Sequence, residues 1–159
     1  MDPLLKLLKD RANLTTAQLA KLLDEEEQSV KRRVSNYEED NTILGYRTIL
    51  NEEKLGESVV RAVIEVKITP ERGGGFNRLA ERIAKYSEVQ SCFLMSGGYD
   101  LLVMVEGSSL QQVASFVSEK LATVRGVLST ATHFMLKPYK EQGVLFVHEP
   151  EDQRLPVSP

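Results

Sequence analysis

Residues 59–68 carry the sequence VVRAVIEVKI, and this stretch decides which class of fold the chain adopts. Successive side chains of a β-strand point to opposite faces, so a period of two in hydrophobicity predicts a strand. Its two faces carry Ala62, Ile64, Val66 and Ile68 on one side and Arg61, Val63, Glu65 and Lys67 on the other. We therefore expect a sheet with a buried apolar face from this point of the chain onward.

Helices and strands alternate after this first strand. The apolar spacing predicts, in order, a helix over 76–83, strands over 89–95 and 99–105, a helix over 110–121 and a strand over 127–136. The order βαββαβ is that of a ferredoxin-like fold, in which both helices cover one face of an antiparallel sheet.

The predicted strand over 99–105 is apolar on both of its faces. Leu101, Val103 and Val105 lie on one face, and Leu102 and Met104 lie on the other. Two helices can cover only one face of a sheet, so we expect the second face to be buried against another subunit. The sequence therefore predicts a homodimer.

The first fifty residues predict three short helices instead. Leucines near the start repeat at helical spacing, and Thr15 or Thr16 is positioned to cap a second helix that ends near Leu23. The acidic residues 24–27 suit the positive end of a third helix, which runs to about Asp40. A tight turn between the last two helices is typical of a helix-turn-helix.

These elements predict an α+β chain: an N-terminal winged helix-turn-helix followed by a C-terminal ferredoxin-like βαββαβ domain. Residues 43–50 are expected to form a short hairpin in the position of a wing, and residues 143–147 one more strand. The expected domains are the winged helix-turn-helix over 1–50, a polar linker over 51–58, the ferredoxin-like domain over 59–148 and a disordered tail over 149–159.

Composition excludes several classes of function. The net charge of −3 means that a nucleic-acid partner requires locally gathered positive charge. Cys92 is the single cysteine and is expected to be a buried thiol, and with only His133 and His148 a metal site or histidine-based triad is hard to assemble. No nucleophile–base pair or cofactor motif stands out, so neither enzymatic activity nor a cofactor is expected. Without a signal peptide or membrane-spanning run, we expect a cytoplasmic protein.

The third predicted helix presents side chains suited to DNA. Val30, Val34 and Tyr37 gather on its inner side at 100° per residue. The opposite side and its flanks carry Gln28, Ser29, Lys31, Arg32, Arg33, Ser35 and Asn36. Arginine can donate two hydrogen bonds to a guanine edge, glutamine or asparagine can bind adenine, and serine or lysine can hold phosphate. A solvated helix face is the alternative, but the preceding turn and the following wing favour double-stranded DNA as the partner.

Two glycine-rich stretches differ in what they indicate. Residues 73–75 lack the lysine and spacing of a phosphate loop, which favours a flexible connection. In residues 96–100, a tight hairpin explains Gly97 and Gly98 but leaves the carboxylate of Asp100 beside an apolar strand. Tyr99 and Asp100 could bind a ligand ammonium while the glycine N–H groups hold its carboxylate, or Asp100 could be a structural cap.

Several short segments, in this order and spacing, resemble the Lrp/AsnC family of feast/famine transcription regulators. The resemblance runs from about Leu4 to Leu136 and rests on Leu19-Ala20, Val30, Arg33-Val34, Glu38-Glu39, Ile43-Leu44-Gly45-Tyr46, Gly98-Tyr99-Asp100-Leu101-Leu102, Arg125-Gly126-Val127 and Thr130-Ala131-Thr132. It implies that the winged helix-turn-helix over 1–50 binds DNA and that the domain over 59–148 binds an effector and forms dimers, four of which often assemble into an octamer. It also implies an effector, commonly an amino acid, bound near Gly98, Tyr99 and Asp100, with Thr130 and Thr132 as further candidates.

The chain departs from the family pattern at both ends of the third helix. Glu26 replaces a frequent serine near its start and Asn41 replaces a frequent glycine at its end, where asparagine can adopt the same left-handed cap. Glu25, Glu26 and Glu27 would meet DNA phosphates, which affects affinity and docking angle. The function expected is sequence-specific DNA binding modulated by an amino acid; the alternative is a non-enzymatic metabolite sensor that acts through protein partners.

Overall fold

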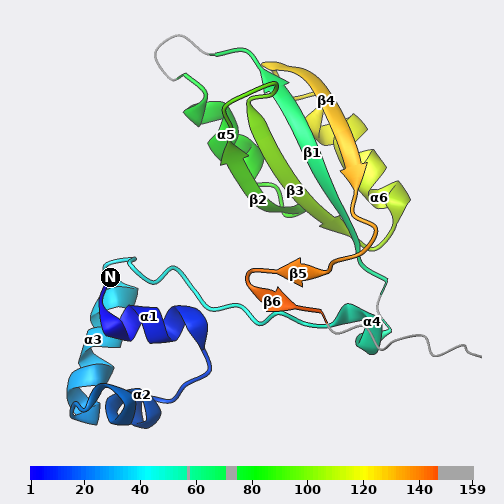
Figure 1. Cartoon of the computed structure of the whole chain (residues 1–159). Coiled ribbons are helices and arrows are strands. Elements are labelled where there is room, and N and C mark those ends of the chain that lie inside the picture. Colours follow the sequence, from blue (N-terminus) through cyan, green and yellow to red (C-terminus); the bar gives the residue numbers. More distant parts are fainter. Residues whose placement is uncertain (57, 71–74, 147–159) are drawn as a thin grey trace, which may run out of the picture. The chain divides into compact units, whose positions relative to one another are not determined.

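The chain forms two compact units in a computed structural model that describes residues 1–56, 58–70 and 75–146. Unit 1 spans Met1–Leu50 and unit 2 begins at Asn51. Unit 1 is helical, and unit 2 contains the sheet (Figure 1). Within the described ranges, no helix has the length and apolar character needed to cross a membrane.

Unit 1 consists of α1 (Pro3–Asp10), α2 (Thr16–Leu23) and α3 (Glu27–Glu39), close to the predicted bounds. Thr15 caps α2 through a capping box: its side chain accepts from the Gln18 N–H, and the Gln18 side chain accepts from the Thr15 N–H. The helices enclose a small apolar core of Leu4, Leu8, Leu19, Ala20 and Val30. Because each helix contributes to this core, packing rather than intrinsic propensity stabilises such short helices.

The hairpin expected over 43–50 is not formed, since these described residues include no strand. The Ile43 N–H donates to the Tyr37 carbonyl over 2.8 Å, and the side chain packs against the core of unit 1. The Tyr46 hydroxyl bonds to Glu38 of α3. The segment therefore begins by folding back on α3. The few residues that remain contain no Asn-Gly type turn, and an isolated two-stranded hairpin without a third strand is only marginally stable.

Unit 2 is built on a four-stranded antiparallel sheet. Its strands are β1 (Val60–Ile68), β2 (Val89–Leu94), β3 (Leu101–Gly107) and β4 (Val127–Phe134), in the spatial order β2-β3-β1-β4. The helices between them are α5 (Asn77–Ala84) and α6 (Leu110–Ser115), the latter continued by the π-helix η1 (Phe116–Leu121). The predicted order βαββαβ is thus confirmed, and the central strands β1 and β3 carry the alternation described above.

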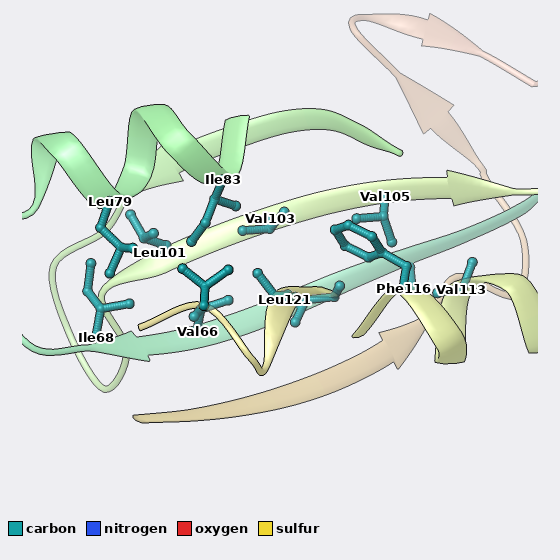
Figure 2. Close-up of a cluster of buried hydrophobic side chains, with 13 residues drawn as sticks. Val66, Ile68, Leu79, Ile83, Leu101, Val103, Val105, Val113, Phe116 and Leu121 are labelled. Atoms are coloured by element: carbon teal, nitrogen blue, oxygen red, sulfur yellow. The ribbon is translucent and has the colours of Figure 1, made fainter. Parts of the chain in front are cut away.

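The main core lies between the sheet and its two helices (Figure 2). Ala62, Ile64 and Val66 of β1 are fully buried, as are Leu101 and Val103 of β3. The helical contribution comes from Leu79, Ile83, Val113, Phe116 and Leu121. Both helices therefore cover the same face of the sheet, as predicted.

The helices α5, α6 and η1 of unit 2 leave the opposite face of the sheet uncovered. Leu102 and Met104 alternate with the buried residues of β3 and are only half-buried, and Phe93 of β2, paired with Leu102, is 50% exposed. We call this surface the open face, defined by Val63, Glu65, Phe93, Leu102 and Met104. Its apolar content matches the two-sided pattern predicted from the sequence.

Three short elements flank this sheet in unit 2. A helical turn, α4 (Glu52–Leu55), lies in the segment predicted to be a polar linker. Strands β5 (Lys140–Glu141) and β6 (Val144–Leu145) pair only with each other, so the strand expected over 143–147 does not extend the main sheet. Pro138 comes between β4 and β5, and proline cannot continue a ladder of hydrogen bonds. The predicted tail at 149–159, Val147, Gly73 and Gly74 lie outside the described residues.

Candidate functional site

The outer side of α3 presents most of the residues predicted to contact DNA. Val30 is fully buried and Val34 and Tyr37 pack beside it, which turns the opposite side of the helix outward. The exposed side chains are Gln28, Lys31, Arg32 and Asn36, while Ser29 and Ser35 are half-buried. Between the described residues, neither Lys31 nor Arg32 forms an ion pair.

Arg33 differs from its neighbours because it is fully engaged inside unit 1. Its Nη2 donates to both carboxylate oxygens of Asp2 at 2.7 Å, and its Nη1 donates to both oxygens of Glu25 at 2.6 and 2.7 Å. Tyr37 also donates its hydroxyl to Asp2. We call Asp2, Glu25, Arg33 and Tyr37 the Arg33 cluster; it ties the start of α1 and the α2–α3 turn to α3.

The pKa values within this cluster follow from these contacts. The hydrogen bonds from Tyr37 and Arg33 lower the pKa of Asp2 from 3.8 to about 2. Hydrogen bonds to Glu25 and Asp2 raise the pKa of Arg33, and the bond to Asp2 raises that of Tyr37. Asp2 and Arg33 are therefore charged and Tyr37 is neutral across the physiological range, and Arg33 serves the fold of unit 1 in this conformation.

The acidic start of α3 is also largely committed to internal contacts. Glu25 is held by Arg33, and Glu27 accepts a 2.7 Å hydrogen bond from the Thr16 hydroxyl of α2. Glu26 is the N-cap and makes no capping hydrogen bond through its side chain. Asp24 and Asn41 take positive φ angles of 55° and 61°, so the expected left-handed cap at Asn41 is confirmed. The repulsion expected between three glutamates and DNA is thus reduced for Glu25 by its arginine partner.

The second candidate site is the turn between β2 and β3. The Met95 N–H donates to the Asp100 carbonyl over 2.8 Å, and the Asp100 N–H donates to the Val66 carbonyl over 3.0 Å. Because residues 95–100 close this turn, β3 starts at Leu101 rather than at the predicted Tyr99. Gly97 has φ +136°, which favours glycine, whereas Gly98 has no positive φ and open space at its Cβ position.

Asp100 joins this turn to the end of the central strand. Its Oδ2 accepts a 2.8 Å hydrogen bond from the Ile68 N–H of β1, beyond the last β1–β3 pair, Val66 with Leu101. The carboxylate thus accepts from the Ile68 N–H at the point where the β1–β3 ladder ends. Asp100 therefore caps β1 and not its own turn. Its second oxygen, Oδ1, has no hydrogen-bond partner in the described ranges, and the side chain is half-buried.

Thr130 and Thr132 of β4 lie beside the same part of β1. They pair with Val66 and Ile64, so both threonines belong to the helix-covered side of the sheet, where they are half-buried. Val66 pairs with Thr130 on one side and with Leu101 on the other. Thr130 therefore shares one end of the sheet with the Gly98–Asp100 turn, whereas Thr132 lies two pairs farther from it.

Comparison with known proteins identifies the family. A model described as the Lrp/AsnC ligand binding domain matches residues 61–145, more than half of the chain. The chain belongs to the Lrp/AsnC family. An HTH-type transcriptional regulator of Bacillus subtilis, YugG, is 41% identical over 157 residues, covering 98% of this chain and 95% of that protein. A proline dehydrogenase transcriptional activator of Rhizobium radiobacter is 26% identical over 141 residues, covering 89% and 90%.

Solved structures of Lrp/AsnC proteins share this fold. A transcriptional regulator of Neisseria meningitidis in complex with L-Met has a TM-score of 0.68 and 24% identity, covering 89% of this chain and 93% of its own. AsnC of E. coli has a TM-score of 0.66 and 21% identity, covering 89% and 95%. The family match spans the Gly98–Asp100 turn and both threonines, so all of the effector candidates lie inside the Lrp/AsnC ligand binding domain.

Two features of this Lrp/AsnC chain were not predicted from the sequence. The Arg33 cluster joins residues 31 positions apart, and no local spacing rule connects Asp2 with Arg33. The contact between Asp100 and the Ile68 N–H depends on where β1 and β3 stop pairing, which hydrophobic periodicity does not specify. Across the described ranges, no group of three or more His, Cys, Asp and Glu side chains is arranged to hold a metal ion.

Proposed function

We propose that this Lrp/AsnC chain is a DNA-binding transcriptional regulator whose α3 contacts double-stranded DNA and whose activity or assembly responds to a small effector of the amino-acid class. The observation that carries the proposal is the outer side of α3, where Arg32 and Lys31 stand exposed beside Gln28 and Asn36. These four side chains can bind base edges and phosphates. Unit 1 supplies the DNA contact and unit 2 the effector response.

The turn between α2 and α3 supports a helix-turn-helix interpretation of unit 1. Only residues 24–26 separate the two helices, and Asp24 has the left-handed conformation that redirects the chain sharply. In helix-turn-helix proteins, residues near the start of the second helix contact base edges. On this interpretation the interface comprises Gln28, Ser29, Lys31, Arg32, Ser35 and Asn36, and we leave out Arg33 because its guanidinium is already paired.

The effector is proposed to bind at the Gly98–Asp100 turn. Oδ1 of Asp100 is available for an ammonium group while Oδ2 keeps its bond to Ile68. The Neisseria meningitidis regulator, crystallised with L-Met, supports an amino acid as the class of effector. Tyr99 and Thr130 lie at the same end of the sheet as Asp100, so they are the next residues that we assign to this site.

The open face of the sheet supports a homodimer. Leu102, Met104 and Phe93 form an apolar patch on a surface that α5 and α6 do not cover. Such a patch is favourably buried by the same patch of a second subunit related by a two-fold axis. Four such dimers in an octamer remain the further assembly expected for the family.

The test is binding of the full-length protein to DNA from its own upstream region. Fluorescence anisotropy should give saturable binding that weakens as salt rises, because released counterions contribute to affinity. Arg32→Ala should weaken binding to the specific site by about 1–3 kcal/mol and relax the sequence preference. Lys31→Ala should weaken binding to all sequences similarly.

Lys85→Ala is the matched control, since it removes one exposed positive charge from unit 2. Undiminished affinity in Arg32→Ala would remove this residue from the interface. If the wild-type protein binds no DNA but still binds an amino acid, the metabolite sensor acting through protein partners becomes the better assignment.

A further inference from the structure

A small pocket lies in unit 2 at the opposite end of β1 from the Gly98–Asp100 turn. Arg61 lines the pocket, while Ile68 contacts Asp100, and the seven residue steps from Arg61 to Ile68 span about 23 Å of strand. Figure 1 shows α4, β5 and β6 beside the end of the sheet where β1 begins and β4 stops. The pocket is therefore separate from the effector site proposed above.

The lining of the pocket is both polar and apolar. Asn51, Glu52 and Arg61 are its polar residues, and Val59, Met135 and Phe146 are among its apolar residues. Its volume is about 170 Å³. An engineered apolar cavity of roughly 150 Å³ can hold benzene, so this volume suits a compact molecule rather than a nucleotide.

The charges around the pocket favour a cationic group. Arg61 donates from Nη2 to Glu52, and its guanidinium also lies 4.0 Å from Glu106 and 3.8 Å from Glu141. Three carboxylates thus face one guanidinium. If Glu52 turned to a ligand ammonium, Glu106 and Glu141 would still neutralise the charge of Arg61. A ligand that offers only a carboxylate would have to compete with all three glutamates for the guanidinium of Arg61.

We propose that this pocket binds a small molecule that carries a primary ammonium group on a compact apolar body. The ammonium contacts Glu52 and the amide oxygen of Asn51, and the apolar body rests against Val59, Met135 and Phe146. An apolar amine and an apolar α-amino acid share this chemistry. Asn51 and Glu52 are the first residues of unit 2, so the occupant contacts the chain directly after unit 1.

The test uses three probes of nearly equal shape with the full-length, ¹⁵N-labelled protein. Leucine carries both charged groups, 3-methylbutylamine lacks the carboxylate, and 4-methylpentanoate lacks the ammonium. The proposal is supported if the amine, leucine or both cause saturable shifts of the backbone signals of Glu52, Val59 and Phe146. Comparing the amine with leucine then distinguishes a free amine from an amino acid as the ligand. No such shifts with either, or equal affinity for 4-methylpentanoate, would overturn it.

Glu52→Gln tests the role of the carboxylate without changing its shape. Loss of a charge-assisted hydrogen bond should weaken binding of the amine roughly tenfold or more. Glu119→Gln, on the exposed side of η1, is the control with the same chemical change and should leave affinity unaltered. Equal affinities in wild type and Glu52→Gln would exclude the assignment.

The proposal does not depend on DNA binding or on the turn at the other end of β1. Asp100→Asn should retain the shifts at Val59 and Phe146 even if it abolishes the effector response. If Asp100→Asn and Glu52→Gln abolish the same single binding event, the separate pocket is refuted while the proposed effector site stands. Failure of the two assignments can thus be told apart.

Discussion

Asp2→Asn should destabilise unit 1 at neutral pH because it removes the charge at the centre of the Arg33 cluster. The lowering of the Asp2 pKa from 3.8 to about 2 corresponds to about 2.4 kcal/mol between the two protonation states. The side chains of Asp2 and Arg33 are 22% and 28% exposed, so solvent screening reduces the expected loss to about 1–2 kcal/mol. The asparagine can still accept from the Leu4 N–H, which preserves the cap of α1.

The pH dependence of this stabilisation has a definite sign. Because folding lowers the pKa of Asp2, the contribution is fully present above the unfolded value of 3.8 and is lost as the pH falls towards 2. About half of it should be gone by pH 3. The difference in stability between wild type and Asp2→Asn should therefore be largest at neutral pH and shrink in acid.

Urea unfolding of the full-length protein, followed through the backbone NMR signals of α3, measures this difference without a contribution from unit 2. Asp10→Asn is the control, since Asp10 is exposed at the other end of α1. Equal unfolding free energies for wild type and Asp2→Asn at pH 7 would refute the reasoning. A difference that stays constant down to pH 3 would show that its origin is not the carboxylate charge.

Four further outcomes are expected. Asp100→Asn should keep the acceptor for the Ile68 N–H and a near-normal thermal stability but lose the effector response. Asp100→Ala should lower the unfolding free energy by about 1–3 kcal/mol, because it leaves that N–H unpaired. If calorimetry finds an unaltered effector affinity in Asp100→Asn, Asp100 has no ligand role. Met104→Glu should place a charge on the open face and make the full-length chain elute as a monomer, and an unchanged elution volume would contradict the dimer through this face. Gly126→Ala should lower the unfolding free energy by about 1–2 kcal/mol, because Gly126 has φ +100° and an added Cβ would lie 3.1 Å from the Leu79 side chain; wild-type stability would disprove this. Burial raises the pKa of the Cys92 thiol, so thiol reagents at pH 8 should modify it slowly until urea is added, and rapid modification of the folded protein would count against its burial.

The sequence predicted those parts of the fold that depend on periodicity. The alternation from Ala62 to Ile68 identified both the strand and its buried face, and the helical spacing of Leu79 and Ile83 identified α5. The hairpin over 43–50 was wrong because Ile43 packs on the core of unit 1, a tertiary contact that outweighs local strand propensity.

The candidate sites were predictable only in part. The outer side of α3 follows from helical geometry once Val30 is placed in the core. Arg33 looked similar to Arg32 in sequence, but its position three residues after Val30 and four before Tyr37 turns it toward Asp2. The pocket beside Arg61 draws on residues from 51 to 146, and no motif in the sequence relates them.

The π-helix η1 gives unit 2 a place where the length of the chain can vary. Phe116 and Leu121 are five positions apart and both face the core, although an α-helix would turn side chains at this spacing about 140° away from each other. Removing one residue between them would leave a spacing of four, which keeps both side chains on one side of an ordinary α-helix. The wide turn of η1 thus accommodates one additional residue without shifting the register of the helix against the sheet. A relative that is one residue shorter in this segment could therefore retain the same core.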